Sequence, residues 1–232
     1  MRQSNKGCSL AMTGLLVLVL ILGGLTLIFL LGSYQQKRAA ELANLPVMTS
    51  ATFYEASPDT EMVITGVLEG NREFATSERY VIYRRQEWDV SYDSEDGYEG
   101  KWKTREKHFP PLNLTIARGS IQILSTDEAR IWGREHTTIV ERSDSTRKAD
   151  GIPEGSIRHI GFKEGDTITV VGKKDSSRGG SLRPTEFYGG DRAQLIKATQ
   201  SEARMSRIIG IVLVVIGIII LVVRVFKLLR GR

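Results

Sequence analysis

The chain has 232 residues, a net charge of +5 and one cysteine, Cys8. A lone cysteine excludes an intramolecular disulfide, a CxxC redox motif and a zinc site built from several thiolates. Residues 33 to 207 contain 26 Lys and Arg residues and all 27 Asp and Glu residues, so this middle part has a net charge of −1. The basic residues at the two ends suit anionic lipid headgroups. The near-neutral middle lacks the basic surface that nucleic-acid binding needs, and we expect no nucleic-acid partner.

The first apolar run, residues 10 to 31, contains no charged residue. At about 1.5 Å per helical residue it is roughly 33 Å long, which matches the roughly 30 Å hydrocarbon core of a bilayer. Arg2 and Lys6 precede the run, as in a signal peptide, but the apolar part of a signal peptide spans about 7 to 15 residues. The longer run favours a transmembrane helix over a cleaved signal, with residues 1 to 9 as an N-terminal tail.

Helical segments connect the predicted spans to the middle of the chain. Residues 32 to 60 are expected to form a helical linker, because "YQQKRAAELANLP" favours helix up to the residue before Pro46. On the other side Asp191 is a good N-cap, and the helix that it begins should continue into a second apolar run. The predicted parts are a juxtamembrane helix, a second transmembrane helix and a basic tail at residues 191–207, 208–226 and 227–232.

Residues 61 to 190 read as a β-rich domain, since short runs of alternating or β-branched residues are separated by glycine and acidic turns. This pattern predicts a mainly β fold, an antiparallel OB-like barrel or sandwich flanked by the two transmembrane helices. Residues 125–160 and 175–190 read as less regular. Strands are expected at residues 62–70, 80–92, 98–109, 112–124 with a turn at Arg118–Gly119, and 166–174.

The stretch "GFKEGDTITVVGKK", residues 161 to 174, raises the question of a phosphate-binding loop. A Walker loop needs Gly, four residues, then Gly-Lys-Ser/Thr. Counting back from Gly172 places Thr167 at the first glycine, and Lys174 stands where the hydroxyl should be. The stretch instead predicts a β-turn at "KEGD", with Gly165 at a position of positive φ, followed by a barrel strand.

Other motifs also favour structural roles. In "DSEDGYEG", residues 93 to 100, the spacing of acidic residues and glycine does not match a calcium-binding EF-hand loop, so a hairpin tip is expected. His108, His136 and His159 lie apart in the sequence without a metal-binding motif. Asn113 begins a glycosylation sequon in form, but it falls within a predicted strand. We therefore predict no catalytic, cofactor-binding or metal-binding residues and no cofactor.

Small residues recur along both predicted spans. Ala203, Gly210, Gly217 and Arg224 are spaced by seven residues and share one helix face, and the first span has glycines at positions 14, 23 and 24. Small residues allow close helix packing, although glycine is also frequent in membrane helices in general. We expect the lipid bilayer as a partner, together with a membrane protein partner or self-association through Gly210 and Gly217. Neither span has an internal Asp, Glu, His or Lys, which disfavours a pump or coupled transporter.

Five pieces of the middle part stand in a characteristic order: "ITGVLEG" (64 to 70), "SERYVIYRRQEWDV" (77 to 90), Trp102, "HFPPLNLTIARGSIQIL" (108 to 124) and "GFKEGDTITVVG" (161 to 172). Their order resembles the GIDE domain family, the membrane-flanked module of a mitochondrial RING-type ubiquitin ligase and its prokaryotic relatives. The resemblance implies a β-barrel-like domain beside a membrane. The zinc-binding Cys and His residues of a RING finger do not occur, so it does not imply ubiquitin transfer. Tyr80 also stands where many relatives have cysteine.

Two uncharged spans, a neutral β-rich middle and no catalytic motif together predict a non-enzymatic scaffold or protein-interaction module anchored in the membrane. The alternative is an accessory subunit that presents substrate to a membrane-associated processing or ligase-like enzyme. Basic residues are equally frequent on the inner and outer flanks of the spans, but four are packed into the final nine residues. By the positive-inside rule this favours a two-pass protein of the cell membrane with cytoplasmic termini and an extracytoplasmic domain.

Overall fold

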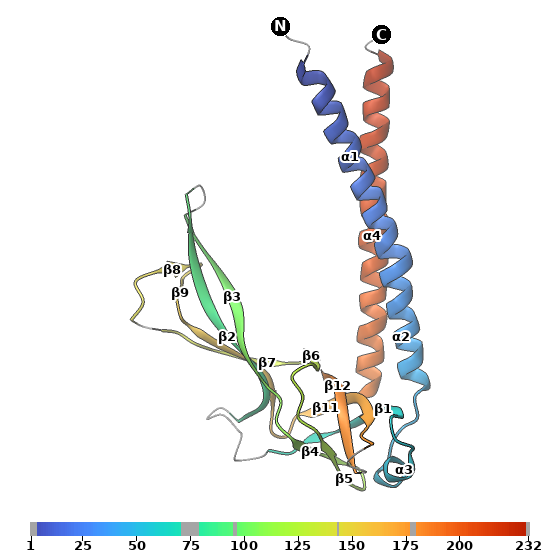
Figure 1. Cartoon of the computed structure of the whole chain (residues 1–232), viewed down its shortest axis with the longest axis vertical. Helices are drawn as coiled ribbons and strands as arrows, with labels where there is room; N and C mark the ends of the chain where they lie inside the picture. Colours follow the sequence, from blue (N-terminus) through green and yellow to red (C-terminus); the bar gives the residue numbers. More distant parts are fainter. Residues whose placement is uncertain (1–3, 71–78, 95–96, 143, 177–179, 231–232) are drawn as a thin grey trace. The chain divides into compact units, whose positions relative to one another are not determined.

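The computed structural model describes residues 4–70, 79–94, 97–142, 144–176 and 180–230. The chain divides into two compact units, which are described separately. Residues 1–44 and 196–232 form the helical unit, and residues 45–195 form the β unit (Figure 1).

The helical unit contains two long helices. The first is continuous through α1 (Ser4–Thr26), the π-helical turn η1 (Leu27–Leu31) and α2 (Gly32–Asn44). The second is α4 (Arg192–Arg230), whose first turn belongs to the β unit. Both are long and apolar enough to cross a membrane. Their apolar side chains face outward, as expected for lipid-facing helices: Leu15, Leu16, Leu18, Val19, Leu22, Phe29, Leu30, Ile208, Ile211, Val212, Val215, Ile219 and Val222 are among those exposed.

The two helices pack antiparallel, so that α1 begins and α4 ends at the same end of the pair (Figure 1). The helices approach closely where Gly24 meets Gly210, and Gly217 lies against Ile21 of α1. Beside this contact the Ser206 hydroxyl donates a hydrogen bond of 3.1 Å to Gln35 Oε1. Gly210 and Gly217 therefore face the first helix of the same chain.

In the β unit, five strands close into a barrel. Numbered one to five in chain order, the strands follow one another around the barrel in the order 1-2-3-5-4. The fourth strand pairs with the first as well as with the fifth, and this pairing closes the barrel. Four of these pairings are antiparallel, and the third and fifth strands pair in parallel. This order is compatible with an OB-like barrel. The strands are β1 (Glu61–Leu68), β4 (Leu112–Ile116), β5 (Gly119–Ile123), β11 (Thr167–Lys174) and β12 (Ser181–Gly189).

The barrel interior is filled by apolar side chains from alternating strand positions. β4 shows the pattern most clearly, since Leu112, Leu114 and Ile116 are buried while the residues between them are exposed. The same core takes side chains from β2 (Tyr80–Asp93) and β10 (Ile157–Lys163), including Ile82 and Phe162. Further fully buried members are Phe53, Met62, Leu68, Val81, Ile121, Ile123, Ile168, Val170 and Leu182.

A short helix, α3 (Ser50–Glu55), packs on the barrel through Phe53, which is fully buried. Thr49 begins the helix with a capping box shared with Thr52. The other end is capped by Lys174, whose buried ammonium group donates 2.6 Å hydrogen bonds to the carbonyl oxygens of Tyr54 and Ala56. Strand β11 thus supplies the cation that satisfies the last carbonyls of α3.

A second, four-stranded antiparallel sheet is built from segments that lie between the barrel strands in sequence. Its order is β3-β2-β10-β7, so β3 and β7 are the edge strands. Trp88 and Val90 of β2 form a small satellite core with Ala149, against which Trp102 and Ile152 pack. A two-stranded ribbon, β8 with β9, contributes Ala149 and Ile152. The elements are β2 (Tyr80–Asp93), β3 (Gly97–His108), β6 (Arg130–Gly133, paired with β12), β7 (His136–Val140), β8 (Lys148–Ala149), β9 (Ile152–Pro153) and β10 (Ile157–Lys163).

The structure confirms the mainly β fold with flanking apolar helices and corrects part of the strand assignment. Residues 125–160 and 175–190 are not irregular, since they contain β6, β7, most of β10 and the barrel strand β12. The expected turn at Gly165 is present with φ +86°. Gly161 and Gly172, however, lie inside strands β10 and β11, where a Cβ atom would be 2.0 Å from the carbonyl oxygen of Ile82 and 2.3 Å from that of Arg183.

Candidate functional site

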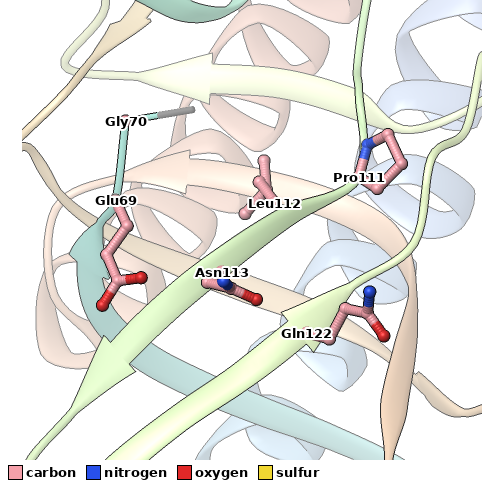
Figure 2. Close-up of a pocket in the computed structure, with 6 residues that line it drawn as sticks. All are labelled: Glu69, Gly70, Pro111, Leu112, Asn113 and Gln122. Carbon is pink, nitrogen blue, oxygen red and sulfur yellow. The ribbon is translucent and has the colours of Figure 1, made fainter. Parts of the chain in front are cut away.

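The described part of the β unit offers two polar pockets and two sheet edges at which another molecule could bind. The first pocket has a volume of about 380 Å³ and lies on the outer face of strands β4 and β5 (Figure 2). Asn113 and Gln122 are directly opposite each other across these strands, and Glu69 lies beside them. The other lining residues are Gly70, Pro111 and Leu112.

Two polar side chains of this first pocket, Gln122 and Glu69, already bond to the barrel. Gln122 Oε1 accepts a 2.8 Å hydrogen bond from the Ser181 hydroxyl, and Glu69 accepts one from the Thr115 hydroxyl. The six lining residues of Figure 2 offer one carboxylate and two amides but no histidine, cysteine or lysine. They can hydrogen-bond a polar molecule, but they do not combine a nucleophile with a base.

The second pocket, of about 520 Å³, lies between the β7 and β11 ends of the β unit and the first turn of α4. His136 Nε2 and Asp166 Oδ1 are 3.0 Å apart, and Asp166 Oδ2 accepts a 2.7 Å hydrogen bond from the Lys163 amide. This network ties the start of β7 to the turn between β10 and β11. Other lining residues are Arg134, Glu135, Thr167, Gly189, Gly190, Asp191 and Gln194.

The first turn of α4 is closed by a capping box. Asp191 Oδ1 accepts a 2.8 Å hydrogen bond from the Gln194 amide, and the Asp191 amide donates to Gln194 Oε1 at 3.2 Å. These two reciprocal bonds satisfy two of the amide donors at the helix start. The predicted N-cap at Asp191 is therefore confirmed, and its role is structural.

One carboxylate at this pocket is electrostatically unusual. Glu135 accepts a bidentate pair of hydrogen bonds from Arg84, at 2.8 and 3.0 Å. An ion pair of this kind lowers a carboxyl pKa, whereas burial raises it. Burial is the larger effect here and raises the pKa of Glu135 despite Arg84. The pair joins β2 to the segment before β7 and fixes where β7 starts.

The three histidines are separated in the sequence, but the structure brings two of them together. His108 and His159 lie on either side of Tyr83, with ring centroids 4.9 and 5.4 Å from the Tyr83 ring. Burial raises the pKa of the Tyr83 hydroxyl. His136 is part of the separate pair with Asp166. Within the described ranges, no three or more His, Cys, Asp or Glu side chains are grouped so that they could hold a metal ion.

The two edges of the four-stranded sheet differ in character. Edge strand β3 carries the charged residues Glu99, Lys101, Lys103, Arg105, Glu106 and Lys107 and has an irregular register against β2 beside Glu106. Edge strand β7, with the sequence His-Thr-Thr-Ile-Val, pairs with β10 over five consecutive residues without a register shift. Ile139 and Val140 remain 46% and 51% exposed.

Charged side chains and bulges protect edge strands from pairing with other chains, so β3 is protected and β7 is not. Among the strands that the structure describes, none pairs with the outer side of β7. The sequence did not identify this site, because residues 125–160 read as irregular. The run of β-branched residues from Thr137 to Val140 was the available signal.

Comparison with known protein families, curated proteins and solved structures found no match.

Proposed function

We propose that this protein is a membrane-anchored interaction module, in which two transmembrane helices hold a β-barrel domain that binds a membrane protein partner. The observation that carries the proposal is the pair of unlike edges on the four-stranded sheet. One edge carries six charged residues, and the other pairs in regular register, is uncharged and is partly apolar. A surface that is open to strand pairing on only one side suits specific recognition of another protein.

The interior of the barrel supports a binding role over a catalytic one. Aromatic and aliphatic side chains fill it, so the exposed surfaces of the β unit are what it can offer to another molecule. The likeness to the GIDE domain family stays a prediction, and it is in keeping with a closed barrel that apolar helices precede and follow in the sequence. In this proposal the chain crosses the cell membrane twice, with cytoplasmic termini and the β unit outside the cytoplasm.

Purification of the full-length chain from its native membrane in mild detergent tests the interaction module. We expect a membrane protein to co-purify in stoichiometric amount, and turnover of a substrate by the purified chain alone would contradict the proposal. If the co-purifying protein is a processing enzyme whose activity depends on this chain, the role is that of a substrate-presenting accessory subunit.

Protease accessibility tests the orientation separately. In intact cells a protease added outside should cleave the β unit, and the termini should become accessible only after lysis. Cleavage of the β unit only in lysed cells would reverse the orientation while leaving the interaction module unaffected.

A further inference from the structure

We propose that edge strand β7 receives an extended segment of a partner protein, which adds to the four-stranded sheet as a fifth, antiparallel strand. The segment that fits has β-branched or other apolar residues facing Ile139 and Val140 and a basic residue at its N-terminal end. Strand addition at β7 rests on the proposed function and deepens it, because it gives the partner's binding mode and chemistry.

The geometry of β7 provides a suitable template for a strand. Its five residues from His136 to Val140 match the usual length of a β-strand, and they run without a bulge beside β10. Every pairing in this sheet is antiparallel, so an antiparallel addition continues its pattern. Backbone hydrogen bonds along an added strand provide affinity, and side-chain contacts on the two faces provide specificity.

The two faces of β7 differ in what they offer. The Thr138 hydroxyl lies 3.1 Å from the hydroxyl of the buried Tyr80, so this side chain points toward the sheet interior. Thr137 and Ile139 alternate with Thr138 and therefore lie on the opposite face. With Ile139 half exposed on that face, an apolar residue directly opposite it would cover its side chain.

Charge determines which residue suits the N-terminal end of the antiparallel segment. Glu141, directly after β7, is exposed. In an antiparallel pair the residue opposite Glu141 lies at the N-terminal end of the added strand. A lysine or arginine there gains a favourable cross-strand pair, whereas an acidic residue meets a like charge.

The same charge disfavours a second copy of this chain as the occupant. Two β7 strands can pair all five of their residues symmetrically only when Thr138 faces Thr138 of the other copy. That register places Glu135 opposite Glu141 twice, once on each side of the twofold axis. Glu141 meets no basic residue in that register, so a basic-ended peptide of a different protein fits better.

The test uses the full-length chain in lipid nanodiscs and two fluorescein-labelled synthetic peptides, KVVTVT and EVVTVT, which differ only at the residue that would face Glu141. Fluorescence anisotropy should show that KVVTVT binds about fivefold more tightly than EVVTVT. In Glu141→Lys the preference should reverse. In Glu99→Lys, which makes the same charge change at an exposed position on edge strand β3, the preference should stay as in the wild type.

A second variant tests strand pairing at β7 independently of the charge of Glu141. Ile139→Lys places a protecting lysine on β7 and should weaken the binding of both peptides about tenfold. Since Ile139 is half exposed, circular dichroism should show an unchanged fold. The proposal is overturned if neither peptide binds the wild-type chain, or if the preference is the same in Glu141→Lys as in the wild type.

Two further measurements show which molecule occupies β7. A dimer of the wild-type chain in light scattering that Ile139→Lys dissociates would show a second copy on β7 and overturn the proposal of a different partner. If the co-purifying membrane protein stays bound to Ile139→Lys, β7 is not its site, while the interaction module itself stands. Loss of that protein from Ile139→Lys but not from Glu99→Lys supports strand addition.

Discussion

Gly24 and Gly210 are in reciprocal backbone contact. A Cβ atom on Gly24 would lie 2.6 Å from the Gly210 carbonyl oxygen, and a Cβ on Gly210 would lie 2.6 Å from the Gly24 carbonyl oxygen. Each glycine thus makes room for the main chain of the other helix, which is how small residues allow helices to pack closely in a bilayer. The two helices are therefore expected to act as one antiparallel pair.

We expect Gly24→Ala to separate this pair, because the methyl group would collide with a backbone atom that cannot rotate away. The measurement is disulfide cross-linking between cysteines placed at Ile21 and Gly217, which are in contact, in a Cys8→Ser background. Cross-linking should slow severalfold in Gly24→Ala. Gly23→Ala is the matched control, since a Cβ at Gly23 meets nothing within 4 Å. Equal rates in both variants would show that the contact is not tight.

The glycines of the stretch from 161 to 174 should respond differently to alanine. Gly161→Ala forces a Cβ against the Ile82 carbonyl and should lower the free energy of unfolding by about 3 kcal/mol. Gly165 has φ +86° but open space around it, so Gly165→Ala should cost about 1 kcal/mol from backbone strain alone. Denaturant unfolding of the full chain in detergent measures both values. A larger effect at Gly165 would contradict the close approach of β10 to β2.

Lys174→Met should destabilise the β unit by about 2 kcal/mol, because it removes the buried ammonium group that donates to the carbonyl oxygens of Tyr54 and Ala56. Lys173→Met is the control, since the neighbouring lysine is exposed. Chemical denaturation compares the two variants, and limited proteolysis near α3 locates the effect. Similar stabilities for both variants would mean that the Lys174 cap contributes little.

The raised pKa of Glu135 predicts how the free energy of unfolding depends on pH. Burial raises its pKa above the ordinary value of 4.5, so the folded protein binds a proton there more readily than the unfolded chain. The contribution of Glu135 to stability is therefore fully present below pH 4.5 and is lost as pH rises through the folded pKa. In Glu135→Gln this dependence should disappear. Unfolding free energies of the wild type and the variant, measured between pH 4 and 7, should differ increasingly in favour of the wild type toward acid.

Asp89 is a control whose pKa is shifted in the opposite direction. The Lys103 hydrogen bond lowers the pKa of Asp89, so its contribution is present above the ordinary pKa and is lost as pH falls through the folded one. Asp89→Asn should therefore lose stability relative to the wild type at neutral pH and approach it in acid. The same pH trend in both variants would show that burial does not dominate at Glu135.

The local patterns of the sequence predicted the strands with clear alternation, and the contacts between distant segments were not predictable. Strand β4 alternates strictly and was expected, whereas β12 was missed because Pro184 interrupts a short run. In the structure Pro184 lies at the irregular register between β11 and β12, where a proline without an amide donor is tolerated. A single sequence does not show which strand becomes a partner of which, and so it could not show that β7 is an edge.

The candidate site depends on this same missing information. The residues from His136 to Val140 are visible as β-branched in the sequence, yet their exposure follows from the order β3-β2-β10-β7. Likewise, His108 and His159 are 51 positions apart and meet around Tyr83 only because β3 and β10 both pair with β2. The sequence showed which side chains are present, but it did not show which of them become neighbours in the fold.

The four-stranded sheet comes from two separate insertions into the barrel. One, with β2 and β3, lies between β1 and β4, and the other, with β6 to β10, lies between β5 and β11. The pairing of β2 with β10 joins them. Removal of either insertion alone would expose the unpaired edge and the apolar face of the other. Neither insertion is therefore expected to be dispensable alone, and related chains should gain or lose the two segments as one unit.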